Sequence, residues 1–357
     1  MLDVSLNDIC IVMMSAVGDA VHVLPVINAL KRRAPSSRIT WVLQPGAAAL
    51  VRGHRSVDDI VLFDRSKGVR AFTEVRRALA SRRFDVVLNL QVYFKAGIVT
   101  SFTRSRVKLG FDRARARDMN WLFTTDKIPP HEPQHVQDQY FEFLTELGVP
   151  HEPVEWDLGP WPREREQQRA FFSEIERPAA SIVVATSKPE KDWLPERWAA
   201  VCDALYHDFG LQPVLVGGRS PREVHAEQVI VERARVKPVS ALGSGLRPLV
   251  GILDGSALVL APDTGPLHMS VALDRPTISL MGYTNPKRTG PYRRYHDLIV
   301  DAYGHPGEDY PISMENRLGR MPRITVRDVL DKVERWRATY APRTQRAAGA
   351  AASDPNS

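Results

Sequence analysis

The sequence predicts an α/β protein made of two doubly wound, Rossmann-like domains that face a central cleft. Apolar runs rich in β-branched residues alternate with helical patterns along most of the 357 residues. The alternation stops in a proline-rich stretch at 149–165 and then restarts. A chain of this length suits two domains, and strands that alternate with helices are typical of a parallel sheet with crossover helices.

In the first half, strands are expected at 8–14, 38–44, 59–64 and 84–91, and helices at 20–35, 46–54, 71–82 and 135–148. In the second half, strands are expected at 181–187, 212–218, 258–263 and 276–282, and helices at 196–207, 221–235, 264–273 and 325–340. We therefore predict domains at 1–160 and 161–341, joined by the proline-rich stretch. The small and polar tail, 342–357, is expected to be disordered.

Composition excludes several classes of protein. The chain is 43% hydrophobic and 25% charged, and no apolar run reaches the length that spans a bilayer. The first residues, MLDVSLNDIC, carry no basic leader, so no signal peptide is expected. Cys10 and Cys202 are predicted to be buried thiols, which suits a reducing cytoplasm.

The net charge of +6 is unevenly distributed. Residues 1–150 hold 21 Lys and Arg against 15 Asp and Glu, so the whole excess lies in the first half. Part of it is a run of six cations: Arg104, Arg106, Lys108, Arg113, Arg115 and Arg117. The run is either an ordinary solvated face or a docking surface for an acidic partner such as a phosphorylated lipid, a nucleic acid or a membrane.

Several familiar motifs are incomplete. The turn after the first strand has Gly18 but no GxGxxG, which disfavours a nicotinamide enzyme, and no phosphate-binding P-loop occurs. The segment 243–248 is predicted to be a plain turn. HEPQH at 131–135 has the spacing of a zinc motif, but Pro133 disfavours helical dihedral angles at Glu132, so no metal site is expected.

The segment APDTGPLHM (261–269) predicts an anion site. Thr264 or Asp263 can cap the following helix, and Gly265 leaves backbone N–H groups open at its positive end. The alternative is a capped helix without a ligand. A second loop follows another strand and adds hydroxyls and cations, at Thr186, Ser187, Lys188 and Lys191. Two such loops in one α/β domain favour a nucleotide-diphosphate site.

Several segments together resemble a known family. They include ICIVMMSAVGDAVHVLPVINALKRRAP, KDWLPERW, GFDRARARD and APDTGPLHMSVALDRPTISLMGYTNPKRTGPY. This combination is similar to the ADP-heptose:lipopolysaccharide heptosyltransferases, glycosyltransferase family nine, which have the GT-B fold. The resemblance covers most of residues 9–340. Val92 replaces a family glycine, and 304–322 lacks the cysteines found there in many members, so the role of that segment stays open.

The resemblance implies a role for individual residues. Asp19 falls on the family's catalytic aspartate, with His22 as the competing base. The donor is expected to contact Thr186, Ser187, Lys191, Glu223, Asp263, Thr264, Gly265 and His268. The acceptor is expected to contact His22, Lys95, Arg113, Arg115 and Arg117.

The resemblance also implies an activity. We expect an inverting, metal-independent glycosyltransferase that needs no cofactor and moves heptose from ADP-heptose to a lipid-linked, anionic inner-core saccharide. It would act as a peripheral protein on the cytoplasmic face of an anionic membrane, without a nucleic-acid partner. The alternatives are transfer from another nucleotide sugar, a nucleotide-sugar 2-epimerase, and a non-catalytic saccharide-binding protein of the same fold.

Overall fold

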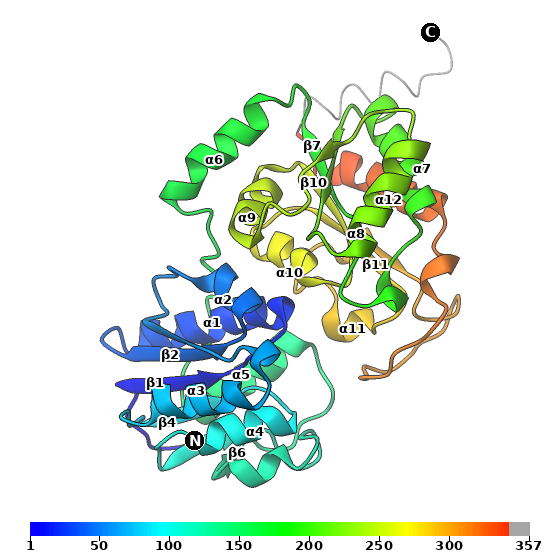
Figure 1. Ribbon diagram of the computed structural model, residues 1–357. Coiled ribbons are helices and arrows are strands. Elements are labelled where there is room, and N and C mark those ends of the chain that lie inside the picture. The colour runs from blue at the N-terminus through cyan, green and yellow to red at the C-terminus, as the bar shows by residue number, and fades with distance from the viewer. Residues whose placement is uncertain (343–357) are drawn as a thin grey trace. The chain divides into compact units, whose positions relative to one another are not determined.

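The computed structural model describes residues 1–342, and the chain divides into two compact units, Met1–Leu158 and a second that begins at Gly159. Each unit contains one six-stranded sheet with helices between its strands (Figure 1). The predicted α/β class with two doubly wound sheets is confirmed. The tail for which disorder is expected lies, from residue 343 on, outside the described residues.

The first unit is built on short strands, of which the central β1 (Asp8–Val12), β2 (Arg38–Leu43) and β4 (Val86–Asn89) are almost wholly buried, as a parallel sheet covered by helices requires. Its other strands are β3 (Asp59–Leu62), β5 (Val107–Gly110) and β6 (Asp126–Lys127). Its helices are α1 (Val17–Arg33), α2 (Pro45–Val51), α3 (Val69–Leu79), α4 (Phe94–Ser101) and α5 (Val136–Glu146), with 3-10 turns η1 (Arg65–Lys67) and η2 (Asn120–Phe123). Val12, Val42 and Val87 form part of its core together with Val75 of α3 and Val99 of α4.

The second unit repeats this plan. Its strands are β7 (Ala179–Val183), β8 (Gln212–Val216), β9 (Val239–Ser240), β10 (Leu258–Pro262), β11 (Thr277–Met281) and β12 (Ile299–Asp301). Its helices are α6 (Pro162–Ser173), α7 (Pro195–His207), α8 (Pro221–Arg233), α9 (Leu246–Gly255), α10 (Gly265–Ala272), α11 (Pro286–Thr289) and α12 (Val326–Thr339), with 3-10 turns η3 (Pro189–Lys191), η4 (His296–Leu298) and η5 (Met321–Arg323).

The strand order positions the candidate sites. The first sheet has the order β3-β2-β1-β4-β5-β6 and the second β12-β11-β10-β7-β8-β9, and every pair is parallel. Both are the same doubly wound order, which reverses between β1 and β4 and between β7 and β10. Ligands of open α/β sheets bind beyond the carboxyl ends of the strands at this reversal.

Two helix starts differ from the sequence prediction for the same reason. Helix α1 begins at Val17 rather than at residue 20, because the Asp19 carboxylate in its first turn accepts the backbone N–H of Ala16 at 2.7 Å. The end of the stretch predicted as a linker is helical, because α6 begins at Pro162 and Glu164 accepts the N–H of Trp161 at 2.9 Å.

The length and hydropathy of its helices determine whether a chain can cross a membrane as a helix. Within residues 1–342, every helix is too short or too polar to cross a lipid bilayer.

Candidate donor and acceptor sites

The loop between β7 and α7 is organised by a carboxylate that the sequence analysis did not single out. Asp192 accepts both the backbone N–H and the hydroxyl of Thr186, at 2.6 and 2.8 Å, through its Oδ1 atom. Burial raises the pKa of Asp192, although the hydrogen bonds from Thr186 oppose this shift. The Thr186 side chain therefore shapes the loop, while its neighbour Ser187 is exposed.

Aromatic and cationic side chains hold the same loop against the rest of the second unit. Trp193 is 1% exposed and its indole N–H donates to the backbone oxygen of Ile324 at 3.0 Å. Arg197 donates to the backbone oxygen of Pro322 at 2.7 Å. Trp193 also contacts Trp198 edge to face, with ring centres 4.6 Å apart. These contacts fix the loop on the body of the second unit.

The two loops predicted to bind one donor meet at Asp263. The Lys191 ammonium lies 2.6 Å from Asp263 Oδ2, and the Thr284 hydroxyl donates to the same oxygen at 2.5 Å. The His268 Nε2 atom lies 3.4 Å from Asp263 Oδ1. One carboxylate thus joins the segments that follow β7, β10 and β11.

Asp263 is held in its ionised form. Its side chain is 8% exposed, and such burial alone opposes ionisation of a carboxyl. The hydrogen bond from His268 and the charge of Lys191 outweigh the burial and hold the pKa of Asp263 well below its ordinary value. The site is therefore a compact group in which Lys191 and His268 lie on either oxygen of one fixed negative charge.

The start of α10 differs in one respect from the prediction. Thr264 is the N-cap residue, but its side chain makes no capping hydrogen bond, and the Asp263 carboxylate is used by Lys191, His268 and Thr284 instead. Gly265 occupies the first position of the helix. The prediction of Thr264 as the N-cap residue is therefore confirmed in position, but neither the Thr264 nor the Asp263 side chain donates or accepts a capping hydrogen bond.

Glu223 is engaged with its own loop. Its Oε1 atom accepts the N–H of Gly218 at 2.6 Å, and its Oε2 atom accepts the N–H of Ser220 at 2.8 Å. A Cβ atom at Gly218 would lie 2.9 Å from Oε2, so the carboxylate closes directly over the glycine backbone. Glu223 is at the carboxyl end of β8, and contact with a ribose stays a prediction.

Tyr283 and the segment 305–320 lie beside this group. The Lys191 ammonium is 6.0 Å from the centre of the Tyr283 ring. The backbone oxygen of Tyr283 accepts the N–H of Arg317 at 2.9 Å, and Thr284 pairs with Asn316 through a β-bridge. The segment whose role the sequence left open is therefore attached to the same edge of the second sheet.

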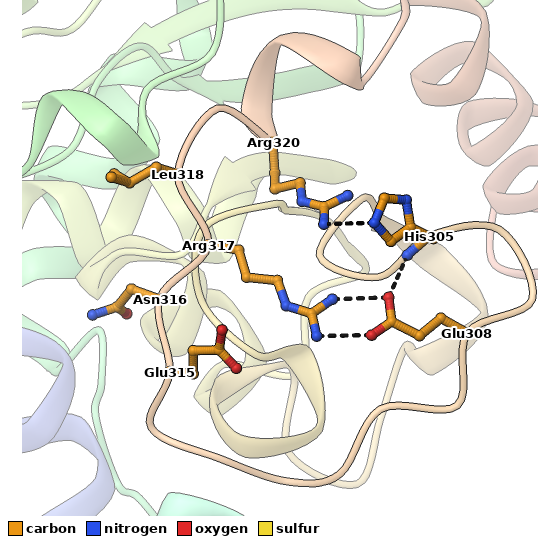
Figure 2. Close-up of a pocket in the computed structure, with 7 residues that line it drawn as sticks. All are labelled: His305, Glu308, Glu315, Asn316, Arg317, Leu318 and Arg320. Atoms are coloured by element: carbon orange, nitrogen blue, oxygen red, sulfur yellow. Dashed lines mark hydrogen bonds and ion pairs between the residues drawn. The ribbon is translucent and has the colours of Figure 1, made fainter.

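Figure 2 shows the polar pocket that this segment encloses, with a volume of about 470 Å³. Arg317 forms a two-pronged ion pair with Glu308, with N–O distances of 2.9 and 2.8 Å, and Arg320 lies 3.1 Å from the His305 ring. The hydrogen bonds from Arg317 lower the pKa of Glu308 to about 2.

In the first unit, Asp19 lies just beyond the carboxyl end of β1. Besides accepting the N–H of Ala16, it contacts the Tyr140 hydroxyl at 3.2 Å through its Oδ1 atom. Lys95 is exposed in the first turn of α4, which follows β4. Because β1 and β4 are neighbours, the predicted base and Lys95 follow the two strands at which this sheet reverses its order.

His22 is an interior residue. It is 4% exposed, and its Nδ1 atom lies 3.0 Å from the side-chain oxygen of Gln137. Gln137 also donates to the backbone oxygen of His22 at 2.8 Å. The His22 ring packs edge to face on the His135 ring, with ring centres 5.8 Å apart. The side chain therefore links α1 to α5, in contrast to the solvent-facing position that acceptor binding requires.

The six cations at 104–117 do not form one surface. Arg104 and Arg106 precede β5 and Arg113 and Arg117 follow it, so the two pairs belong to opposite edges of the sheet. Lys108 lies within β5, and burial lowers its pKa.

Arg115 is largely buried and bonded within the first unit. It pairs with Asp112 and also with Glu142, the latter at 2.7 Å, and it donates to the backbone oxygen of Pro129 at 2.8 Å. Arg115 and Lys108 therefore do not belong to an exposed basic surface, and the choice between a solvated face and a docking surface concerns the exposed cations. Those of this run at the carboxyl edge are Arg113 and Arg117.

Potential metal ligands are scattered over the fold. Within residues 1–342, no three His, Cys, Asp or Glu side chains are grouped so that they could hold a metal ion. His135 of the HEPQH segment instead caps α5, where its ring accepts the N–H of Gln137 at 3.1 Å.

Comparison with known proteins decides the family. Residues 72–313 match the sequence model of glycosyltransferase family 9 (heptosyltransferase). The chain belongs to glycosyltransferase family 9. It is thus a glycosyltransferase, and the family resemblance of its sequence motifs is confirmed.

Curated relatives of this glycosyltransferase cover most of its length. A lipopolysaccharide core heptosyltransferase, OpsX, from Haemophilus influenzae is 28% identical over 315 residues, which are 85% of this chain and 89% of that protein. Lipopolysaccharide heptosyltransferase 1 from Escherichia coli is 26% identical over 311 residues, covering 83% and 92% of the two chains.

Solved structures share the fold. The glycosyltransferase family 9 protein from Veillonella parvula matches with a TM-score of 0.79 at 23% identity, over 94% of this chain and 98% of that one. The Escherichia coli heptosyltransferase WaaC with ADP matches with a TM-score of 0.73 at 24% identity, over 92% and 99%. The GT-B fold predicted for the chain is confirmed.

Proposed function

We propose that this glycosyltransferase transfers L-glycero-D-manno-heptose from ADP-heptose to an inner-core lipopolysaccharide acceptor, with inversion and without a metal ion. The names of its relatives, lipopolysaccharide heptosyltransferases aligned over most of the chain, support this pair of substrates. The observation that carries the proposal is the Lys191–Asp263 pair beside the uncapped start of α10, at the strand reversal of the second sheet.

The second unit is proposed to bind the donor. The N-terminus of α10, which has no side-chain cap, and the Lys191 ammonium provide positive charge for a diphosphate. In the transfer, the bond between the anomeric carbon and the diphosphate oxygen breaks, and ADP leaves with the electron pair. Lys191 and the helix N-terminus would stabilise this developing charge, which is the task that a bound metal ion performs in other transferases. Asp263 would hold Lys191 in place and accept hydrogen bonds from the sugar.

The first unit is proposed to bind the acceptor and to supply the base. An acceptor hydroxyl forms the new bond to the anomeric carbon, and its proton passes to the carboxylate of Asp19. We favour Asp19 over His22 because the imidazole is 4% exposed and bonded to Gln137, whereas Asp19 lies at the carboxyl edge of the sheet. Exposed Lys95, Arg113 and Arg117 would attract an anionic acceptor on the cytoplasmic face of the membrane.

The test is acceptor-dependent release of ADP. The purified protein is incubated with ADP-heptose, with and without inner-core lipopolysaccharide that lacks heptose, and the product is identified by mass spectrometry. Release of ADP only with acceptor, together with one added heptose, is the expected result. Release without acceptor, or a changed sugar nucleotide without transfer, would contradict the proposal.

A matched pair of variants tests the donor site. Lys191→Ala is expected to lower turnover by about a hundredfold or more, as for loss of one transition-state donor in a dry site. Lys237→Ala, an exposed lysine that precedes β9, is the control and should leave turnover unchanged. Equal turnover of the two variants would remove Lys191 from the mechanism.

A further inference from the structure

Four large apolar side chains of the first unit are exposed where a folded domain would ordinarily bury them. The exposed fractions are 50% for Tyr93, 40% for Phe94, 59% for Met119 and 56% for Leu122. They belong to two segments, the start of α4 and the 3-10 turn η2, and we call them the apolar patch. Contiguous exposed apolar surface on a folded unit marks a site of interaction.

The two segments of the apolar patch are packed directly on each other. The Asn120 side chain donates to the backbone oxygen of Tyr93 at 2.6 Å. The rings of Phe94 and Phe123 meet edge to face, with centres 5.4 Å apart. A Cβ atom at Gly97 would lie 2.3 Å from the Phe123 ring, so α4 and η2 approach as closely as a glycine allows.

The backbone supports the exposure of Met119. Asp118 and Met119 have φ angles of 51° and 59°, in the left-handed region that residues with a Cβ atom rarely adopt. Met119, a member of the apolar patch, is exposed at this turn.

Three exposed cations lie in or before the segments that carry the apolar patch. Lys95 follows Phe94 directly, and Arg113 and Arg117 precede Met119 on the same edge of the sheet; all three side chains are exposed. The Arg113 guanidinium lies 4.8 Å from the centre of the Trp121 ring, so one of these cations lies over an aromatic side chain between Met119 and Leu122. A few apolar and aromatic side chains with cations beside them match the boundary between lipid phosphates and acyl chains.

We propose that the apolar patch inserts into the surface of an anionic lipid bilayer, with Lys95, Arg113 and Arg117 contacting the lipid phosphates. The proposal deepens the proposed function and rests on it for the lipid-linked acceptor. The patch follows β4 and β5, so it belongs to the same edge of the first sheet as Asp19. Insertion would therefore bring a membrane-anchored acceptor to the edge that carries the proposed base.

Vesicle co-sedimentation without any donor tests the patch separately from the transferase activity. The vesicles contain phosphatidylcholine with or without phosphatidylglycerol. The full chain is expected to bind the anionic vesicles, and Met119→Ser with Leu122→Ser should lower the partition coefficient by about tenfold or more, because two inserted side chains are lost. The matched control, Met314→Ser with Leu318→Ser, removes two exposed apolar side chains of the second unit and should bind as the parent does.

Two further measurements keep the proposal falsifiable. Tryptophan fluorescence of the parent should be quenched by anionic vesicles with brominated acyl chains, and Trp121→Phe should reduce this quenching. Equal binding by parent and patch variant, or no quenching, would overturn the proposal. So would a parent that ignores vesicles but forms a dimer in analytical ultracentrifugation that the patch variant does not, because the patch would then join two copies of the chain.

Discussion

Asp263→Asn tests the group that joins the two donor loops. The substitution keeps the shape of the side chain but removes the charge that faces Lys191 at 2.6 Å, and an amide nitrogen can replace an acceptor oxygen. The Lys191 side chain is 17% exposed, so the ammonium would lose its partner in a mostly buried position. Loss of one member of a buried pair costs about 3–5 kcal/mol.

The expected cost lies at the lower end of this range. The Lys191 ammonium is already partly exposed and can gain further contact with water. The amide oxygen of the variant side chain would still accept one hydrogen bond from Thr284. We therefore expect a loss of about 3 kcal/mol in the free energy of unfolding. For a unit of this size, this lowers the midpoint of thermal unfolding by about 6–12 °C.

The assay is differential scanning calorimetry with an exposed ion pair as the control. Lys287 and Asp309 are 2.8 Å apart, but the Asp309 side chain is 96% exposed, so Asp309→Asn should leave the midpoint of thermal unfolding nearly unchanged. The double variant Lys191→Met with Asp263→Asn should be more stable than Asp263→Asn alone, because no unpaired cation remains. Equal midpoints for Asp263→Asn and Asp309→Asn would refute the reasoning.

Three other predictions concern catalysis and pH. Asp19→Asn is expected to fold and bind ADP-heptose normally, because an amide oxygen can still accept the Ala16 N–H, yet to lose about a hundredfold or more in turnover in the ADP-release assay; near-normal turnover would remove Asp19 as the base. Full turnover in excess EDTA is expected from the charge that Lys191 supplies, and a strict need for added Mg²⁺ would contradict this. The lowered pKa of Asp263 makes its contribution to stability complete above the ordinary carboxyl pKa of about 4 and lost as the pH falls through the folded value. The raised pKa of Asp192 has the opposite sign, so stability is gained as the pH falls through its folded value. Urea midpoints between pH 7 and pH 3 should therefore show the penalty of Asp263→Asn shrinking below about pH 4 and the penalty of Asp192→Asn growing in acid; a penalty independent of pH would refute the assignment for Asp263.

The sequence is sufficient to predict the doubly wound sheets because their central strands are buried on both faces. β1, β7 and β10 read as apolar runs that no amphipathic helix would show. The edge strands β6 and β9 have two residues each and leave no periodic pattern. Helix α6 escaped prediction because prolines on either side of Trp161 resemble a linker more than a helix start.

The candidate site was predictable in its parts and not in its connections. The loops of Lys191 and Asp263 each show a recognisable pattern, but their ion pair joins residues 72 positions apart and depends on the order of strands in the sheet. Thr284 belongs to the quoted motif GYTNP, yet nothing in its local sequence indicates a hydrogen bond to Asp263. Asp192 was missed because a carboxylate beside Lys191 reads as an ordinary surface charge.

The anchoring of the donor loop has a consequence for synthesis on the ribosome. The indole of Trp193 and the guanidinium of Arg197 are bonded to the backbone of Ile324 and Pro322, which are translated more than a hundred codons later. Strand β7 likewise cannot form its parallel pairing with β10, at the centre of the second sheet, until β10 has been made. The first unit can complete its sheet as soon as residue 158 has emerged, whereas the donor loop stays unfinished until almost the whole described chain has been made. A nascent chain that stalls after residue 158 has emerged and before residue 322 is made would therefore carry a complete first unit and an unfinished proposed donor site.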